Sequence, residues 1–194
     1  EPGAMGEPLY LDIVNFAKTV GLDVDIIGGR AGLGSKDVLP EDILPVFEEL
    51  QKDHPMHGFT IGIVDDVTNL SLPRADKMPL DTTGLTACKF WGFGSDGTVG
   101  ANKNSVKIIG DNTDMFVQAY FEYDTKKSGG VTKSHLRFGK NPIRSTYYIK
   151  SADFLACHKP VYMSTYDIVG EVKDGGVFLL NCGWSQEELE THLS

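Results

Sequence analysis

A glycine-rich turn at residues 92–97 restricts the fold of this chain more than any other feature of its sequence. Gly92, Gly94 and Gly97 form a G-x-G-x-x-G pattern between a predicted strand, residues 87–93, and a predicted helix that begins at Thr98. In that position glycines permit a tight turn and let the backbone approach a phosphate, while the helix N-terminus supplies N–H donors and positive potential. The pattern therefore predicts an α/β unit with a candidate anion site at this turn.

The candidate site extends from the turn into the first turns of the helix. Ser95 and Thr98 add hydroxyl groups, and Lys103 adds a cation. The dinucleotide-binding form of the motif also needs an acidic residue at the end of the second strand to hold a ribose. Asp124 is the candidate, although it lies further along than usual, and two lysines follow it at 126 and 127. A solvated glycine-rich turn explains the same pattern, so the residues alone leave a phosphate site and a plain turn equally open.

Helical and strand periodicities alternate along the rest of the chain. Before residue 71 we predict helices at 9–20 and 40–51 and strands at 23–27 and 59–64. After residue 86 the periodicity predicts further strands at 115–123, 131–138, 153–158 and 177–181, and helices at 98–109, 164–172 and 184–192. This order predicts the α/β class, with two open, mainly parallel three-layer α/β units joined by a linker.

The linker is predicted where periodicity disappears, at residues 71–86. Pro73, Pro79 and Gly84 interrupt any regular element there. We place the first unit at residues 1–73, the linker at 74–86 and the second unit at 87–194.

Charge and cysteine content exclude several classes of function. The 18 basic and 27 acidic residues give a net charge of −9, which argues against a nucleic-acid partner. No apolar stretch approaches the roughly 20 residues that span a membrane. The three cysteines are widely spaced, without a C-x-x-C pair, so we predict no metal site and a reducing cytoplasmic setting. The chain opens without an initiator methionine or signal peptide, and we expect it to be part of a longer protein.

Several long motifs resemble one family, the pyruvate:ferredoxin (flavodoxin) oxidoreductases. Residues 90–105, FWGFGSDGTVGANKNS, are similar to the opening of the gamma-type region of these enzymes. Motifs of the same region follow in the same order at 118–121, 123–132, 134–139, 152–158 and 175–181. Upstream, residues 1–4, 6–12, 28–30, 32–36 and 65–68 resemble the end of the region that precedes it in the family. The resemblance spans essentially the whole chain.

The resemblance implies a part of an enzyme and not a complete one. Enzymes of this family convert pyruvate to acetyl-coenzyme A with thiamine diphosphate, pass electrons through [4Fe-4S] clusters to ferredoxin or flavodoxin, and are expected to be homodimers. The residues that bind those cofactors lie outside this chain, so we predict no catalytic residue here. We expect a scaffold role and a coenzyme A contact at Gly94, Ser95, Asp96, Gly97, Thr98, Gly100, Asn102 and Lys103. The alternative is a nucleotide- or phosphate-binding Rossmann-like module.

Overall fold

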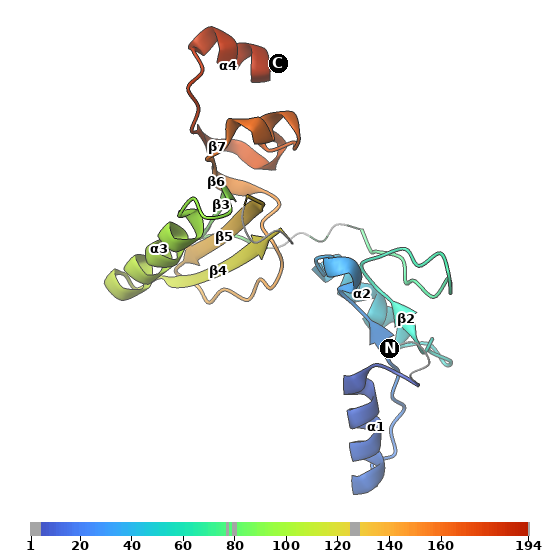
Figure 1. Ribbon diagram of the computed structural model, residues 1–194. Helices are drawn as coiled ribbons and strands as arrows, with labels where there is room; N and C mark the ends of the chain where they lie inside the picture. The colour runs from blue at the N-terminus through green and yellow to red at the C-terminus, as the bar shows by residue number, and fades with distance from the viewer. Residues whose placement is uncertain (1–4, 77, 79–80, 125–128, 194) are drawn as a thin grey trace. The chain divides into compact units, whose positions relative to one another are not determined.

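The computed structural model describes residues 5–76, 78, 81–124 and 129–193 of the chain (Figure 1). Residues 1–4, 77, 79, 80, 125–128 and 194 lie outside this description. They include parts of the predicted linker and the two lysines at 126 and 127. The chain divides into two compact units, Glu1–Leu80 and Asp81–Ser194, which we call unit 1 and unit 2.

Unit 1 contains two α-helices and a very small sheet. Helix α1 (Pro8–Val20) ends at Gly21, whose φ of 70° gives a left-handed C-cap, as predicted. Strands β1 (Gly29–Arg30) and β2 (Phe59–Thr60) pair in parallel, with the short 3-10 helix η1 (Leu33–Ser35) and helix α2 (Pro40–Glu49) between them. Both predicted helices are therefore confirmed.

The two strands predicted in unit 1 were wrong in position or length. Residues 23–27 form no strand, and parallel pairing is confined to Gly29 and Arg30, two residues further on. The second strand stops at Thr60 instead of residue 64, because Gly62 turns the chain with a φ of 79°. The apolar pattern marked a buried segment at residues 59–61 but not at 23–27, and it could not show how few residues would pair with a partner strand.

The C-terminal end of unit 1 is tied to helix α2. The buried carboxylate of Asp42 accepts hydrogen bonds from Nε of Arg74 at 2.6 Å and from its second guanidinium nitrogen at 3.0 Å. Next to it, the backbone N–H of Ala75 donates to the carbonyl of Glu41 at 3.0 Å. Residues 74 and 75 are thus held to unit 1, although sequence analysis assigned them to the linker.

Unit 2 is built on one five-stranded sheet in the order β4-β5-β3-β6-β7. Its strands are β3 (Leu85–Phe93), β4 (Phe116–Tyr123), β5 (Val131–Gly139), β6 (Ala152–Cys157) and β7 (Val172–Leu180). Strand β6 pairs in parallel with β3 and β7, whereas β5 pairs antiparallel with β3 and β4. Four strands therefore point one way, and β5 is reversed. The α/β class and the mainly parallel arrangement are confirmed.

Helical segments lie on both faces of this sheet. Helix α3 (Thr98–Asn112) packs against β3, β4 and β5 (Figure 1). On the opposite face the 3-10 helices η2 (Pro160–Ser164) and η3 (Val169–Glu171) replace the α-helix predicted at 164–172, which was wrong. Helix α4 (Gln186–Leu193) ends the chain with the predicted capping box, in which Ser185 and Glu188 exchange hydrogen bonds.

The core of unit 2 lies on the face of the sheet away from α3. Trp91, Leu155, Cys157 and Ile168 are all at most 2% exposed and pack with Tyr162 from η2. In the described part of the chain, no helix has the length and apolar character needed to cross a membrane.

Candidate functional site

The glycine-rich turn joins β3 to α3, as the sequence predicted. Ser95 and Gly97 have φ values of 77° and 89°, so the chain reverses through two left-handed residues before α3 begins. Gly92 permits close packing, because a Cβ there would lie 2.8 Å from the side chain of Thr98 and 2.9 Å from Oγ1 of Thr132. A Cβ at Gly94 would lie 3.2 Å from the backbone nitrogen of Gly129. These two glycines therefore let α3 and the β4–β5 hairpin approach the end of β3.

Asp96 supplies an anion of its own at the N-terminus of α3. Its carboxylate accepts hydrogen bonds from the backbone N–H groups of Phe93 and Thr98, both at 2.8 Å. Burial opposes ionisation of this carboxyl, but the backbone hydrogen bonds outweigh it and lower the pKa of Asp96. The N–H groups of Val99 and Gly100 have no acceptor within the helix, since the first turn of any α-helix leaves its amides unpaired. A ligand anion at this turn would therefore meet those two amides beside a carboxylate.

The other predicted site residues divide between the surface and the interior. Ser95 and Gly100 are exposed, and the ammonium of exposed Lys103 lies 5.4 Å from the centre of the Phe121 ring on β4. Asn102, by contrast, is 3% exposed, and its Nδ2 donates to the carbonyl of Thr98 at 2.9 Å. The fold thus gathers the turn and Lys103 near one end of the sheet, while the Asn102 side chain lies between α3 and the strands.

Asp124 does not occupy the position that a dinucleotide-binding unit requires. Strand β5 lies between β3 and β4, so the end of β4 is not next to the glycine-rich turn in the strand order. Sequence reasoning could not foresee this, because the antiparallel β4–β5 hairpin inserts its second strand into the middle of the sheet. The hairpin instead brings its own backbone to the turn, where the N–H of Gly94 donates to the carbonyl of Gly130 at 2.8 Å.

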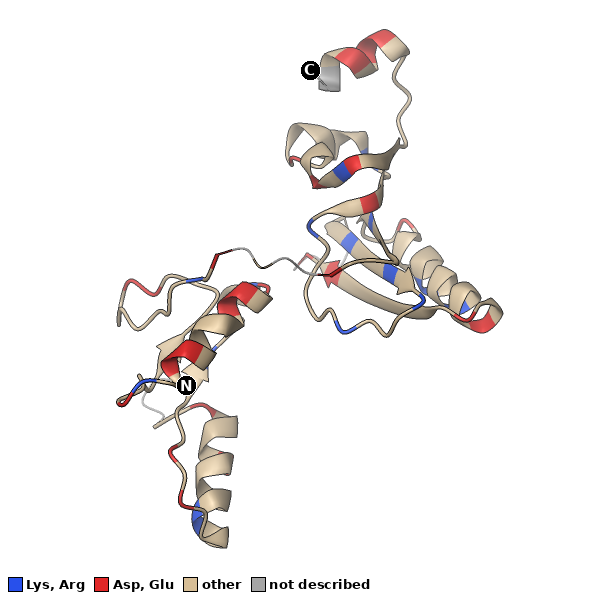
Figure 2. Cartoon of the chain, turned by 180° about the vertical axis from the view of Figure 1, so that it is seen from behind, with Lys and Arg blue, Asp and Glu red and all other residues tan. Residues whose placement is uncertain are grey.

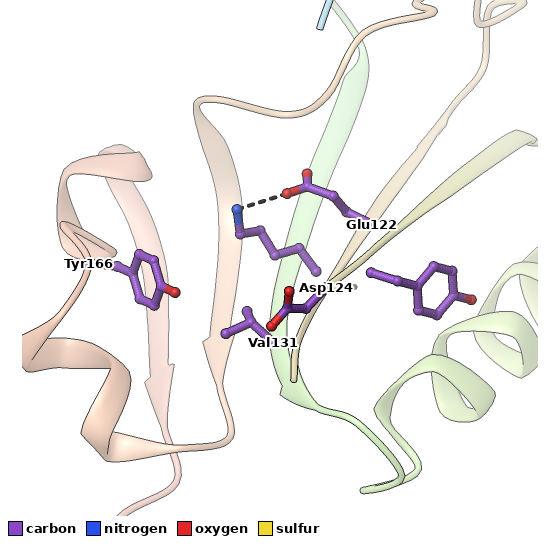
Figure 3. A pocket seen from close by; sticks show the side chains of 6 residues that line it. Glu122, Asp124, Val131 and Tyr166 are labelled. Atoms are coloured by element: carbon purple, nitrogen blue, oxygen red, sulfur yellow. Dashed lines mark hydrogen bonds and ion pairs between the residues drawn. The ribbon is translucent and has the colours of Figure 1, made fainter. Parts of the chain in front are cut away.

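Asp124 lines a separate pocket on the opposite face from α3. The pocket has a volume of about 220 Å³ and is lined by Glu122, Tyr123, Asp124, Val131, Lys133 and Tyr166. Figure 3 shows Asp124 beside Val131, with Glu122 and Tyr166 on other sides of the same hollow. It opens where β4 ends and β5 begins, at the same end of the sheet as the glycine-rich turn.

A chain of charged groups borders this pocket. Nζ of Lys133 lies 2.8 Å from Oε1 of Glu122 (Figure 3). It also lies 4.6 Å from the centre of the Trp91 ring. The buried His135 accepts the N–H of Ile149 at its Nδ1, which places its proton on Nε2, 3.4 Å from Oε2 of Glu122. This contact lies outside hydrogen-bond geometry, and Nε2 of His135 has no hydrogen-bond partner among the described residues. His135 and then Lys133 hold the pKa of Glu122 at about 2, while burial lowers the pKa of His135.

Sequence analysis missed this charged face of the sheet. Lys133, His135 and Arg137 alternate along β5, and Lys89 with Trp91 occupies the neighbouring positions on β3. The alternation was the available signal, because residues two apart on a strand share a face. Lys89 is 4% exposed and forms an ion pair of 2.6 Å with Glu171, whose other carboxylate oxygen accepts the indole N–H of Trp91 at 3.0 Å.

Cys88 and Cys157 do not fit a shared iron–sulfur cluster. Cys88 lies opposite Phe154 in the strand register and Cys157 opposite Trp91, an odd number of residues apart, so the two side chains point to opposite faces of the sheet. Burial raises the pKa of the Cys88 thiol to about 11 and also raises that of Cys157, whereas cluster ligation needs thiolates. Among the described residues, no group of three or more His, Cys, Asp or Glu side chains could hold a metal ion.

Comparisons with known proteins point to one family. Residues 87–192 match the family model described as pyruvate ferredoxin/flavodoxin oxidoreductase. The whole chain is 58% identical to a pyruvate-flavodoxin oxidoreductase of Klebsiella pneumoniae and 53% identical to a pyruvate:ferredoxin oxidoreductase of Moorella thermoacetica. The chain spans only 17% and 16% of the length of these relatives. A solved pyruvate oxidoreductase subunit PORC of Thermotoga maritima aligns with 56% of each chain at a TM-score of 0.47 and 17% identity.

Proposed function

Because this chain belongs to the pyruvate ferredoxin/flavodoxin oxidoreductase family, we propose that it is one part of an enzyme that oxidatively decarboxylates pyruvate to acetyl-coenzyme A. The electrons pass to ferredoxin or flavodoxin. The observation that carries this proposal is that more than half of the residues along the whole chain are identical to those of two such oxidoreductases. Since the chain spans about a sixth of their length, it works in this proposal together with the remaining domains of a longer polypeptide.

The proposed enzyme is cytoplasmic and homodimeric, and its redox cofactors are held outside this chain. Thiamine diphosphate would supply the carbanion chemistry of decarboxylation, and [4Fe-4S] clusters the electron path. The placement of Cys88 and Cys157 on opposite faces of the sheet supports assigning the clusters elsewhere. In isolation the chain is then inactive, and its role is to supply scaffold and part of a substrate-binding surface.

We assign the coenzyme A contact to the turn between β3 and α3, from Gly94 to Lys103. Three features support a phosphate of coenzyme A at this place. The N–H groups of Val99 and Gly100 are unpaired within α3. The hydroxyl of Thr132, 93% buried beside Gly92, has no hydrogen-bond partner among the described residues. The ammonium of Lys103 extends from the second turn of the helix. The ionised carboxylate of Asp96 would repel an anion. We therefore place the proposed phosphate on the side of the turn where Val99 lies, away from that carboxylate.

The second candidate function is a nucleotide- or phosphate-binding module, and the pocket beside Asp124 favours it. The Asp124 carboxylate could accept hydrogen bonds from ribose hydroxyls, as acidic residues do in dinucleotide sites, and the Tyr166 ring on the other side of the pocket could stack on a base. The two candidates differ in the ligand they need. Coenzyme A should bind in competition with inorganic diphosphate if the glycine-rich turn is used, whereas adenosine without phosphates should compete only if the pocket is used.

The test of the proposed function is steady-state kinetics of the complete enzyme with pyruvate and coenzyme A varied in turn. We expect pyruvate- and coenzyme A-dependent reduction of ferredoxin or flavodoxin, and its absence would refute the proposal. Lys103→Ala should raise the coenzyme A KM about ten- to a hundredfold with little change in the pyruvate KM, since a charge-assisted contact to phosphate contributes roughly 1.5–3 kcal/mol. The matched control is Lys107→Ala, an exposed lysine one turn further along α3. Equal effects of the two substitutions would remove Lys103 from the site.

A further inference from the structure

Helix α1 carries a continuous apolar stripe that the described residues of unit 1 leave exposed. The stripe consists of Leu9, Ile13, Phe16 and Val20, which are between 44% and 71% exposed. Their spacing of four, three and four residues keeps them on one side of the helix and is the spacing with which helices pack against one another. Exposed apolar patches that are continuous mark interaction sites far more often than single exposed residues do.

The stripe is distinct from the face that attaches α1 to its own unit. Tyr10 packs its ring 4.7 Å from that of His57, and Ala17 is 6% exposed. On a helical wheel these residues lie about 90° from the centre of the stripe. One side of α1 is therefore in use within unit 1, and the stripe is a second, unoccupied side. Figure 2 shows that few charged residues interrupt α1.

Helix α2 repeats the same arrangement. Ile43 and Phe47, with Leu50 at the C-cap, follow the spacing of four and three residues and are between 39% and 60% exposed. Acidic residues also mark this helix (Figure 2), but Glu41, Asp42 and Glu49 are buried. The sheet of the unit is also very small. Strands β1 and β2 pair in parallel over only two residues each, whereas parallel sheets normally have longer strands and are covered on both faces. Two helices with bare stripes beside so short a parallel pair are typical of part of a larger α/β layer.

We propose that the α1 stripe is an intramolecular docking face, covered by an amphipathic helix of the same polypeptide that lies outside residues 1–194. A second copy of the chain is a poorer occupant. The stripes of α1 and α2 offer seven apolar side chains, and between separate molecules their burial would first have to offset the entropy lost on association. A segment of the same polypeptide avoids most of the entropy lost when two molecules associate. About five-sixths of the length of the relatives lies outside the region that this chain matches.

The inference rests on the chain being one part of a longer polypeptide, as proposed above, but not on the reaction. Photo-cross-linking in the complete polypeptide tests it. Phe16 is replaced by p-benzoyl-phenylalanine, which keeps an aromatic ring at the centre of the stripe, and the cross-linked peptides are identified after irradiation. We expect a cross-link to an apolar helical segment outside residues 1–194, within a product of single-polypeptide mass. The control places the same group at Asn15, which lies on the polar side of α1 and should not reach that segment.

Each other outcome overturns the inference. A product of doubled mass identifies a second copy as the occupant, a cross-link within residues 1–194 identifies unit 1 itself, and no cross-link means that the stripe faces solvent. A second variant gives an independent readout if the bulky group perturbs packing. Phe16→Glu in the complete polypeptide should lower the Tm by several degrees, whereas Asn15→Glu should leave it unchanged. Because none of these measurements uses pyruvate, a failure here is separable from a failure of the proposed enzyme activity.

Discussion

Gly92 sets the distance between α3 and the sheet, and a single methyl group should disturb it. A Cβ at this position would lie 2.8 Å from Thr98 and 2.9 Å from Oγ1 of Thr132, closer than real contacts allow. Both neighbours are buried, so neither has room to move aside. We expect Gly92→Ala to lower the free energy of unfolding of unit 2 by about 1–3 kcal/mol, measured by urea denaturation of the chain.

Gly100→Ala is the control for this substitution. A Cβ at Gly100 meets no atom within 4 Å, and the residue lies in the first turn of α3 without a positive φ. Alanine should therefore stabilise the helix by about 0.5–1 kcal/mol. If Gly92→Ala proved as stable as the unsubstituted chain, close packing would not explain the glycine. Close approach of a ligand to the backbone would then be the better explanation.

The same residues show how far the sequence can lead at this scale. The G-x-G-x-x-G pattern predicted the strand, the turn and the start of α3 correctly. It could not show that Gly92 makes room for Thr98 and Thr132 of the protein itself, because the pattern does not specify which neighbour approaches. Nor could it show that Asp96 accepts two backbone N–H groups of the turn, since that depends on the folded path of the loop.

At the scale of elements, periodicity identified the strands of unit 2 but not their order. Each predicted strand there exists, because short runs rich in apolar, β-branched and aromatic residues between turn signals are typical of strands. The place of β5 between β3 and β4 depends on contacts between distant residues, and no local pattern records them. Asp124 was consequently expected beside the glycine-rich turn, and the pocket with Glu122 and Lys133 was not foreseen.

The contacts between β4 and β5 predict how unit 2 responds to acid. The folded pKa of Glu122 is about 2, below its ordinary value of 4.5, so its ionised form stabilises the fold above pH 4.5 and that contribution disappears as the pH falls toward 2. Glu122→Gln should cost about 1 kcal/mol at pH 7, a modest value because the side chain is 30% exposed. The difference between the two proteins should shrink to nothing near pH 2. Urea denaturation at pH 7, 4 and 2 measures it.

Two comparisons isolate Glu122 from other acid-sensitive groups. His135 also weakens the fold in acid, because its folded pKa is lowered by burial and the unfolded chain takes up the proton first. Since Glu122 raises the pKa of His135, this effect differs in Glu122→Gln, and it cancels only when the comparison is repeated in a His135→Asn background. Glu187→Gln, an exposed carboxylate on α4, should show no such dependence on pH. A difference at pH 2 as large as that at pH 7 would contradict the assigned pKa.

At the scale of the whole molecule, the sequence predicted two α/β units because two alternating regions flank an aperiodic one. The division of the structure falls between Leu80 and Asp81, inside that aperiodic region. The sequence could not show at which residues the linker begins and ends. Residues 71–75 lack periodicity but are fixed by side-chain and backbone contacts to α2 and β2, and β3 begins at Leu85, two residues before the predicted start.

Limited proteolysis should therefore cut first between residues 76 and 84. On the N-terminal side, Arg74 is bound to the buried carboxylate of Asp42, and on the C-terminal side Leu85 enters the sheet opposite Gly139. Between them the sequence contains Pro79 and Gly84, which disfavour regular structure, and proteases cut most readily outside helices and strands. A protease specific for acidic residues, which can cut at Asp76 and Asp81, should release two fragments that resist further cleavage, as mass spectrometry would show.

Arg74→Ala should extend the sensitive region toward Ser71, because it leaves the Asp42 carboxylate buried without its guanidinium partner. A first cut within residues 87–99 would contradict the boundary, since those residues form β3 and the turn into α3.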